Sequence, residues 1–413
     1  MRVGIEAINL YGGPTYLQVR TLFEARGLDL ERFENLMMEK KSVALPCEDP
    51  VTNGVNAAKP LIDRLDEQAR NRIEMVIVGS ESGLDFGKAM STYVHDYLGL
   101  SRECRLFEVK QACYGGTAAL QMAANFVASG VSPGASVLVV ATDVARGLDS
   151  GDSLHYAEPS QGTGAVAMLV SEKPTVLELD FGANGYHSYE VMDTCRPRAD
   201  VERGDPDLSL LSYLDCLDAS YRSYARKVEG VDLRNTFNYL AFHTPFGGMV
   251  KGAHRKLMRG ILRAKPDEIA EDFRLRVQPS LNYCVQVGNV YSATIYFALC
   301  GLIDSAPISG HQRVGLFSYG SGCSSEFFSG VVSEASKADL ANLKIQQRLD
   351  ARIQLDMPTY EKLEQLNRAQ VLGEENQEVN LHPVQDLYDR FFAGSGLLVL
   401  KRIKKFHREY DWS

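Results

Sequence analysis

The feature that most constrains this chain is an alternation of short β-rich runs with longer segments whose apolar residues recur at helical spacing. Such alternation favours an α/β fold, in which helices pack against a sheet. Strands are predicted at residues 2–8, 75–79, 106–109, 136–142, 165–170, 176–181, 238–243, 314–319 and 326–332. Helices are predicted between them, at residues 117–127, 208–228, 252–263 and 288–302.

The predicted elements fall into two series with similar layouts, one on each side of residue 175. In each series one strand ends in a polar residue and a later strand ends among small residues. We therefore expect an N-terminal half at residues 1–175, a second half at 176–332, and a helical extension at 333–413 that packs on the second half. The charge-dense stretch 196–207, which holds two prolines, is predicted to be a solvated loop.

The composition is that of an ordinary globular chain. Of the 413 residues, 45% are hydrophobic and 23% are charged, and the net charge of −9 argues against a broad nucleic-acid surface. Polar residues interrupt the most apolar stretch, 284–303, which indicates a buried helix rather than a membrane span. The eight cysteines lack the spacing and histidine neighbours of a zinc site, and no secretion signal opens the chain. We expect reduced thiols, no metal and a cytoplasmic location.

A cysteine between a predicted strand and a predicted helix is the first candidate for chemistry. Cys113 is surrounded by small residues in the sequence QACYGGTAAL. Near a helix N-terminus the positive end of the helix dipole lowers the pKa of a thiol, so we predict a nucleophilic thiolate there. The structural alternative is a buried, unreactive cysteine.

Three polar residues adjoin other predicted elements. Glu81 follows a buried strand, where poor solvation should raise its pKa toward the range useful for proton transfer; a cap or an ion-pair partner is the alternative. His243 closes a strand before a Pro/Gly turn and could donate to a thioester carbonyl; a core histidine is the alternative. Asn289 begins a predicted helix, where an N-cap is the alternative.

A glycine-rich strand end adds a candidate for binding a carbonyl oxygen. Gly320, Ser321 and Gly322 follow a predicted strand, and glycines there let backbone amides approach a developing oxyanion. Their spacing does not fit a phosphate-binding loop.

Seven motifs occur in an order that is more specific than any one of them. They are the run around Glu81, QACYGG at 111–116, ATDVAR at 141–146, QGTGAVAML at 161–169, FHTPF at 242–246, GNVY at 288–291 and SYGSG at 318–322. From residue 1 to about residue 332 the chain resembles the 3-hydroxy-3-methylglutaryl (HMG) synthase family of the thiolase superfamily.

This resemblance implies a five-layered αβαβα thiolase fold, a homodimer and an acyl group carried on Cys113. Glu81 would be the general acid/base, and His243 and Asn289 would bind the carbonyl oxygen of the second substrate. Asp193 matches the family and is expected at the substrate site. No metal or organic cofactor is implied, since the substrates are thioesters carried on phosphopantetheine.

Two departures from the mevalonate-pathway members point to an altered pocket. Gly147 stands where those enzymes carry a tyrosine, and Thr194-Cys195 replaces an aromatic pair before Arg196-Pro197. The C-terminal segment resembles the branch that acts in polyketide β-branching, in which acyl carrier proteins deliver both the acetyl donor and the β-ketoacyl acceptor. We predict that branch, with an HMG-CoA synthase using acetyl and acetoacetyl coenzyme A as the first alternative.

A basic stripe could contact such a carrier. Lys251, Arg255, Arg259 and Arg263 recur at every fourth residue of a predicted helix that follows His243. At the pocket mouth they could meet the phosphates of coenzyme A or the acidic surface of an acyl carrier protein; a solvated helix face is the alternative. Two alternatives to the whole interpretation are a ketosynthase that decarboxylates a malonyl donor and a non-catalytic scaffold.

Overall fold

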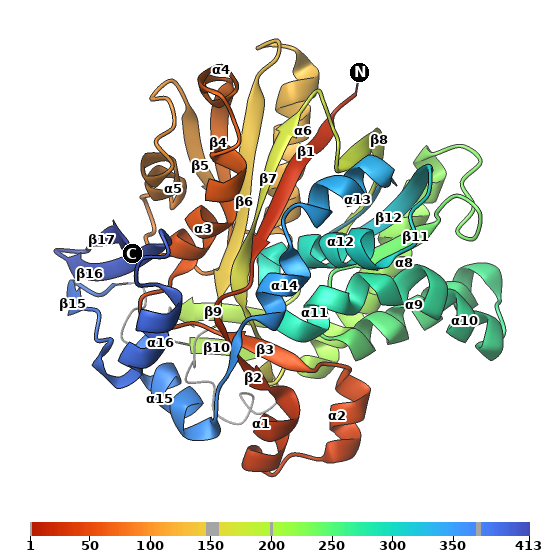
Figure 1. Ribbon diagram of the computed structural model, residues 1–413. Coiled ribbons are helices and arrows are strands. Elements are labelled where there is room, and N and C mark those ends of the chain that lie inside the picture. The colour runs from red at the N-terminus through yellow and green to blue at the C-terminus, as the bar shows by residue number, and fades with distance from the viewer. Residues whose placement is uncertain (1, 146–156, 199–200, 369–372) are drawn as a thin grey trace.

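The computed structural model describes residues 2–145, 157–198, 201–368 and 373–413 (Figure 1). Nine strands of this described part form one hydrogen-bonded sheet in the order β11-β12-β13-β8-β1-β7-β6-β4-β5. Their bounds are β1 (Gly4–Tyr11), β4 (Ile73–Gly79), β5 (Arg105–Val109), β6 (Ser136–Val144), β7 (Thr163–Ser171), β8 (Leu177–Ser188), β11 (Tyr239–Phe242), β12 (His311–Gly320) and β13 (Ser324–Ser333). The nine strands predicted from the sequence are these nine.

Helices cover both faces of this sheet and give the molecule five layers. α3 (Pro50–Ile62) packs on one face of β1, β6 and β7, and α6 (Gly115–Ser129) packs on the other face of β4, β6 and β7. α12 (Thr294–Ser305) packs on β11 and β12, and α8 (Pro206–Lys227) covers β8 and β13. The layers are α3, the first half-sheet, the α6 and α12 pair, the second half-sheet and α8. The predicted thiolase fold is therefore confirmed.

Alternating side chains explain why both faces of the first half-sheet are covered. In β6, Val137 and Val139 join the core cluster that contains α6 and α12, whereas Leu138 and Val140 join the cluster that contains α3. All nine residues of this strand are buried. A strand buried on both faces needs apolar residues at successive positions, because neighbouring side chains point to opposite sides.

The two half-sheets are joined by a short pairing between β1 and β8, at Gly4 with Glu178 and Ile5 with Leu177. The central helices add a buried hydrogen bond of 3.0 Å between the hydroxyl oxygens of Thr117 and Tyr296. The two halves therefore pack around a shared central layer.

Smaller elements surround this body. The strands are β2 (Thr15–Gln18), β3 (Lys40–Val43), β9 (Thr194–Arg198), β10 (Val201–Gly204), β14 (Ile353–Gln354), β15 (Asn376–Glu378), β16 (Leu398–Lys404) and β17 (His407–Trp412). The helices are α1 (Val19–Arg26), α2 (Leu30–Leu36), α4 (Glu67–Asn71), α5 (Ser91–Tyr97), α9 (Gly247–Leu262), α10 (Pro266–Asp272), α11 (Leu281–Val287), α13 (Glu334–Ala341), α14 (Ile345–Asp350), α15 (Met357–Arg368) and α16 (Gln385–Phe391). Short 3-10 or π turns span Phe273–Val277, Gln278–Ser280, Tyr291–Ala293 and His382–Val384.

The C-terminal extension differs from its prediction in two ways. It contains β14 to β17 as well as helices, and most of it packs on the N-terminal half, beside α1 and α3 (Figure 1). Leu398 of β16 joins the core around α3, and Tyr360 of α15 packs in one cluster with Leu17 of β2. Arg408 of β17 donates to the buried carboxylate of Asp49 at 3.1 Å. The expected packing on the second half holds for α13, which contacts α12 and β13.

Two other predicted elements also have different structures. The described residues of the stretch 196–207 do not form an irregular loop, because β9 and β10 pair antiparallel and α8 already begins at Pro206. The helix predicted at 288–302 begins only at Thr294. Gly288 and Tyr291 have φ values of 94° and 46°, which interrupt the helix before that point.

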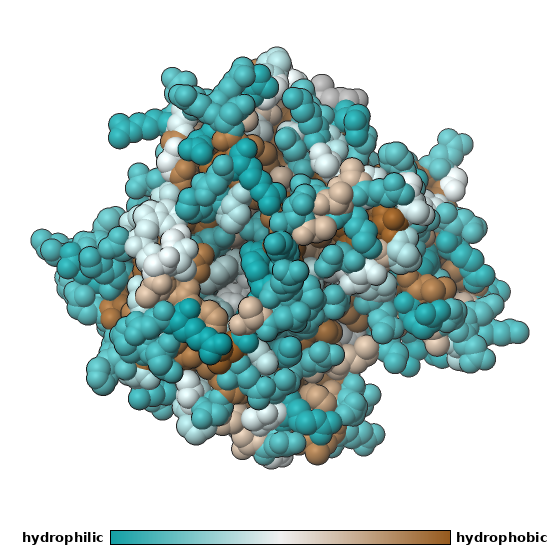
Figure 2. All heavy atoms as spheres, in the orientation of Figure 1, coloured by the Kyte–Doolittle hydropathy of each residue, from teal (hydrophilic) through white to brown (hydrophobic). Residues whose placement is uncertain are grey.

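The face seen in Figure 2 is mostly hydrophilic, with apolar residues in separate patches. Within the described ranges, no helix combines the length and the apolar character needed to cross a membrane. In the same ranges no three histidine, cysteine or acidic residues are grouped as a metal site.

Candidate active site

Cys113 lies in a tight turn between the end of β5 and the start of α6. The N–H of Tyr114 donates to the carbonyl of Gln111 at 3.0 Å and closes the turn. Ala112, just before the cysteine, has a φ of 43°, a left-handed conformation that costs a residue with a side chain about 1–3 kcal/mol. The surrounding packing therefore holds the cysteine in a backbone conformation that the chain would not adopt alone.

The thiol of Cys113 is not the thiolate that its place near a helix N-terminus predicted. Burial, followed by the negative charges of Glu81 and Asp143, raises the pKa of Cys113 well above its usual range. The thiol donates to Oε2 of Glu81, with 3.4 Å between sulfur and oxygen. The prediction was wrong about the charge because the dipole effect is smaller than the cost of a buried anion beside two carboxyl groups. A protonated thiol needs a base before it can act as a nucleophile, and the carboxyl group of Glu81 is in contact with this one.

The position of Glu81 is set by Asp143, a buried residue near the end of β6. Oδ1 of Asp143 accepts hydrogen bonds from the N–H groups of Glu81 and Ser82, both at 2.9 Å. Its Oδ2 accepts from the N–H of Ser292, in the turn before α12, at 3.0 Å. Gly116 allows α6 to approach this turn, because a Cβ there would lie 2.3 Å from the carbonyl oxygen of Ser292. One carboxylate thus ties both halves of the molecule together at the loop of Glu81.

Arg196 forms an ion pair with Glu81 inside the cavity. Its Nη2 is 3.1 Å from Oε1 of Glu81 and 3.3 Å from Oε2 of Glu202. Its guanidinium carbon is 4.9 Å from the ring centroid of Tyr291. Burial raises the pKa of Glu81 to about 7, and the positive charge of Arg196 opposes that rise. A carboxyl group with a pKa near neutrality can both take up and return a proton.

His243 and Asn289 provide neutral hydrogen-bonding groups. His243 follows β11, and burial lowers its pKa to about 3, so the imidazole is uncharged at neutral pH. Within the described part of the chain, its Nδ1 is buried without a hydrogen-bond partner. Oδ1 of Asn289 accepts from the N–H of Tyr291 at 2.9 Å and from the hydroxyl of Thr294 at 2.8 Å. These bonds occupy the oxygen of the amide and orient its nitrogen, Nδ2, as the donor.

The glycine-rich strand end divides into residues that line the cavity and residues that support them. Ser321 and Gly322 line the cavity, whereas Gly320 packs against the turn before Cys113. Asp193 is fully buried, and its carboxylate accepts from the hydroxyl of Tyr319 at 2.6 Å and from the N–H of Gly322 at 2.8 Å. Asp193 is absent from the cavity lining in the described part of the chain, so it supports the loop.

The cavity has two adjoining chambers. The inner chamber, of about 410 Å³, brings together the four residues predicted to be catalytic, Glu81, Cys113, His243 and Asn289. The outer chamber, of about 250 Å³, is lined in part by the exposed residues Asn35 and Asp205, and the inner chamber also reaches the surface, at Lys110 and Gly322. The residues that line both chambers are Thr194, Glu202, Ser209, Pro245, Met249, Asn289 and Tyr291. A substrate that reaches Cys113 through the outer chamber therefore passes Asn289 on the way.

The two departures from the mevalonate-pathway sequences, at Gly147 and at Thr194-Cys195, have different outcomes in the structure. Thr194 and Cys195 line the inner chamber, so the exchange of an aromatic pair for small side chains does alter the pocket. Gly147 lies outside the described residues.

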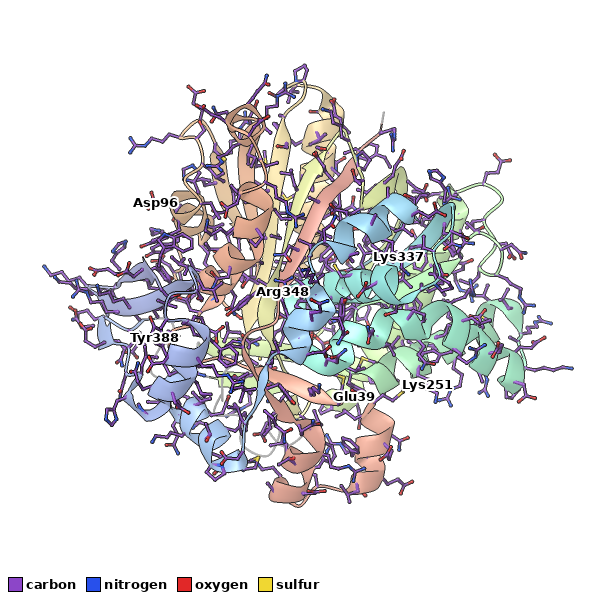
Figure 3. All side chains as sticks on the ribbon, viewed as in Figure 1. Glu39, Asp96, Lys251, Lys337, Arg348 and Tyr388 are labelled. Atoms are coloured by element: carbon purple, nitrogen blue, oxygen red, sulfur yellow. The ribbon has the colours of Figure 1, made fainter. Side chains whose placement is uncertain are left out.

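The basic stripe lies on α9 but runs away from the cavity. Lys251, which is labelled in Figure 3, and Arg255, Arg259 and Arg263 are all exposed. In the described chain, α9 contributes Met249 to the cavity lining but none of these four residues. With a rise of about 1.5 Å per residue, Arg263 lies about 20 Å along the helix from Met249. The predicted place at the pocket mouth is therefore wrong for the distal end of the stripe.

Known proteins resemble this chain over almost its whole length. The sequence profile "Hydroxymethylglutaryl-coenzyme A synthase N terminal" matches residues 1–175, and the corresponding C-terminal profile matches residues 261–412. The chain is 52% identical over 415 residues to the polyketide biosynthesis 3-hydroxy-3-methylglutaryl-ACP synthase PksG of Bacillus subtilis (strain 168), with 99% of each chain covered. It is 34% identical over 367 residues to the hydroxymethylglutaryl-CoA synthase of Enterococcus faecalis, which covers 88% of this chain and 91% of that one. The solved structure of the curacin biosynthetic pathway HMG synthase in complex with holo donor-ACP matches with a TM-score of 0.97 at 55% identity and 100% coverage of both chains.

The chain belongs to the hydroxymethylglutaryl-CoA synthase family. It is an enzyme that transfers an acyl group and condenses it, and the predicted family is confirmed. Sequence reasoning missed two groups of this site: Arg196, which lines the inner chamber, and Asp143, which is buried behind the loop of Glu81. Asp143 ends an apolar run just as Glu81 does, so the same argument could have singled it out. Arg196 gave no such signal, because it lies in a stretch whose charge density is equally typical of a solvated loop.

Proposed function

We propose that this HMG synthase acts in polyketide β-branching, taking acetyl from a donor acyl carrier protein and adding it to a β-ketoacyl chain on an acceptor carrier. The observation that carries the proposal is the full-length identity of 52% to an HMG-ACP synthase, against 34% to an HMG-CoA synthase. The outer chamber supports it. Arg32 is the one basic residue of its described lining, beside the acidic Glu202 and Asp205. Coenzyme A would bring several phosphate charges to this mouth, where basic partners would be expected.

In the first proposed step, the sulfur of Cys113 attacks the carbonyl carbon of the acetyl thioester. The thiol proton passes to Glu81, which the sulfur contacts at 3.4 Å. A carbon–sulfur bond to Cys113 forms, the bond to phosphopantetheine breaks, and the departing thiolate takes the proton back. Because the pKa of Glu81 is about 7, the same carboxyl group can act as base and then as acid.

In the second proposed step, Glu81 removes a proton from the methyl carbon of acetyl-Cys113. The resulting enolate carbon attacks the β-ketone carbon of the acceptor and forms the new carbon–carbon bond. The ketone oxygen becomes an alkoxide that accepts hydrogen bonds from His243 and from Nδ2 of Asn289 and then takes the proton from Glu81. Fixed neutral donors are suited to this task, since they stabilise the developing charge without reorganising.

In the last proposed step, water attacks the thioester carbonyl that still joins the product to Cys113. The carbon–sulfur bond breaks, a carboxylic acid forms, and the sulfur regains its proton. The backbone N–H of Ser321 is proposed to stabilise the oxyanion of the Cys113 thioester, with Gly320 packing behind it. Asp193 would act indirectly: it accepts the N–H of Gly322 and so holds the loop that carries Ser321. The proposed chemistry needs no metal or organic cofactor.

Carrier binding is proposed to involve the near end of the basic stripe. Lys251 lies two residues after Met249, which lines both chambers, whereas Arg263 is the C-cap of α9. Acyl carrier proteins are acidic, so a positive helix face beside the mouth would favour docking. On this proposal the contribution to binding decreases from Lys251 through Arg255 and Arg259 to Arg263.

We also propose that two copies form a homodimer, as the resemblance implies. β5 is an edge strand of the described sheet, and its Phe107 and Val109 are only partly buried, so it offers an unpaired edge to a second copy. A monomer in light scattering would exclude this assembly. The expected cytoplasmic location stays part of the proposal and agrees with eight free cysteines; fractionation of cells tests it.

The deciding experiment compares two acetyl donors. The rate of acetylation of Cys113 is measured by intact mass with acetyl carried on an acyl carrier protein or on coenzyme A at equal concentration. We expect the carrier to be the faster donor, and Lys251→Glu to slow its reaction more than Arg263→Glu does. Equal or faster labelling by acetyl coenzyme A would favour the mevalonate-pathway alternative.

A matched pair of variants shows which thiol carries the acetyl group. Cys113→Ala should lose the adduct, whereas Cys195→Ala, which removes another thiol of the same chamber, should keep it. An adduct that survives Cys113→Ala would contradict the proposed nucleophile.

A further inference from the structure

A buried ionic cluster joins the C-terminal extension to the wall of the outer chamber. Glu158 is 7% exposed, and its Oε1 accepts from Nη2 of Arg26 in α1 at 3.2 Å and from the hydroxyl of Tyr360 in α15 at 3.0 Å. The Nζ of Lys41 in β3 donates to the backbone carbonyl of Glu158 at 2.6 Å and to the Tyr360 hydroxyl at 3.1 Å. Three segments that are far apart in the sequence thus hold one glutamate, and we name these four residues the Glu158 cluster.

Two cations of the Glu158 cluster compensate the negative charge of its glutamate. Burial acts to raise the pKa of Glu158, but hydrogen bonding and charge from Arg26 and the charge of Lys41 outweigh it, so the pKa lies below its usual value. The carboxylate is therefore charged at neutral pH. Loss of one partner from a buried ion pair leaves the other charge uncompensated, which is far more disruptive than breaking an exposed pair. The cluster is thus a firm support for the backbone at residue 158.

That backbone leads directly to Asn289. Glu158 lies in a turn closed by a hydrogen bond of 3.0 Å from the N–H of Ser160 to the carbonyl of Ala157. The carbonyl of Ser160 accepts from the N–H of Asn289 at 2.7 Å, and the N–H of Gly162 donates to the carbonyl of Asn289 at 2.9 Å. The segment anchored by Glu158 therefore holds Asn289 by both of its backbone polar groups.

We propose that Glu158 is a positioning residue for the carbon–carbon bond-forming step, through which α15 of the C-terminal extension fixes the side-chain amide of Asn289. The inference rests on the proposed function, in which Nδ2 of Asn289 donates to the acceptor ketone. A displacement of about 1 Å in such a group can cost about a hundredfold in rate. Acetyl loading of Cys113 and removal of an acetyl proton by Glu81 do not use this donor, so they do not depend on Glu158.

The test separates these steps in Glu158→Ala and in Tyr360→Phe, which keeps the ring and loses only the hydroxyl. Enzyme already acetylated on Cys113 is mixed with a β-ketoacyl carrier, and single-turnover condensation is followed by mass. Condensation should fall about tenfold or more in Glu158→Ala and less in Tyr360→Phe. Acetyl loading and deuterium exchange of the acetyl methyl group in D₂O should keep the wild-type rate. In an Asn289→Ala background, Glu158→Ala should add no further loss.

Glu178→Ala is a control for the substitution itself, because it also breaks an Arg–Glu pair with two hydrogen bonds, to Arg2, at an exposed position outside the cavity lining of the described chain. It should leave all three rates unchanged. Two results would overturn the positioning role. One is that Glu158→Ala lowers condensation as much in the Asn289→Ala background as in the wild type. The other is that Glu158→Ala slows loading, exchange and condensation equally. If wild-type Cys113 took up no acetyl group from either donor, the proposed function itself would fail, which is a separate outcome.

Discussion

The two halves of the sheet contribute different kinds of groups to one cavity, an ion-paired carboxylate from the first and neutral hydrogen-bonding groups from the second. The first half supplies Glu81, whose loop is hydrogen-bonded to Asp143 and whose carboxylate is paired with Arg196. The second half supplies His243 and Asn289, which are neutral, and the buried Nδ1 of His243 has no hydrogen-bond partner among the described residues. A proton carrier needs a pKa near neutrality, so in the proposed mechanism burial and a counter-charge must nearly balance at Glu81. A carbonyl-binding group needs the reverse, a fixed donor whose charge state does not change with pH.

The largest effect is expected from Glu81→Gln, which keeps the shape of the side chain and removes the base. In enzyme already acetylated on Cys113, single-turnover condensation should fall by about a thousandfold, because general-base catalysis contributes about 10² to 10⁴. Deuterium exchange into the acetyl methyl group, measured by mass without an acceptor, should be lost as well.

The exchange measurement also separates two mechanisms. A decarboxylating ketosynthase would form its carbanion from a malonyl donor and would not need Glu81. Exchange and condensation at the normal rate in Glu81→Gln would therefore contradict the assignment of Glu81 as the base. The first half would then no longer contribute an ionisable catalytic group.

The places of Glu81 in the first half and of His243 in the second could be predicted from the sequence for one physical reason. Strands such as β4 and β11 are apolar runs that end in a polar residue, and the ends of both runs meet in the inner chamber, where they place Glu81 and His243. Local order along the chain was enough to predict this, since the direction of a strand fixes where its last side chain lies.

The groups that tune the site could not be predicted in this way. Arg196 reaches Glu81 because the β9–β10 hairpin folds over the cavity, and nothing in a charged, proline-containing stretch distinguishes that hairpin from a solvated loop. The charge of Cys113 was also beyond local reasoning, because it depends on Glu81 and Asp143, which are distant in sequence. The extension was misplaced for the same reason: the contact between Arg408 and Asp49 spans almost the whole chain.

A smaller effect is expected on the neutral side. His243→Ala should lower single-turnover condensation by about a hundredfold, since removing one preorganised donor to a developing oxyanion costs about 10² to 10³. Deuterium exchange into acetyl-Cys113 should persist, because Glu81 and its partners are untouched. His243→Gln, which restores an N–H donor, should recover part of the loss. A loss of exchange equal to that of condensation would show that His243 acts on the donor instead, and the two sides would no longer be separable.

The smallest effect at neutral pH, and the most informative about charge, is expected from Arg196→Gln. Arg196 lowers the pKa of Glu81 against the larger effect of burial, so its removal should raise that pKa above about 7, by about one unit or more. Condensation requires the ionised base, so activity is lost as the pH falls through this pKa, and the acid limb of the pH–rate profile should move to higher pH. At pH 7 the rate should fall about fivefold or more and recover near pH 9. Arg196→Lys keeps the positive charge and should keep the limb near its original position, whereas His243 should add no limb in this range because its pKa is about 3. A profile that Arg196→Gln leaves unmoved would mean that the ion pair orients Glu81 without setting its charge.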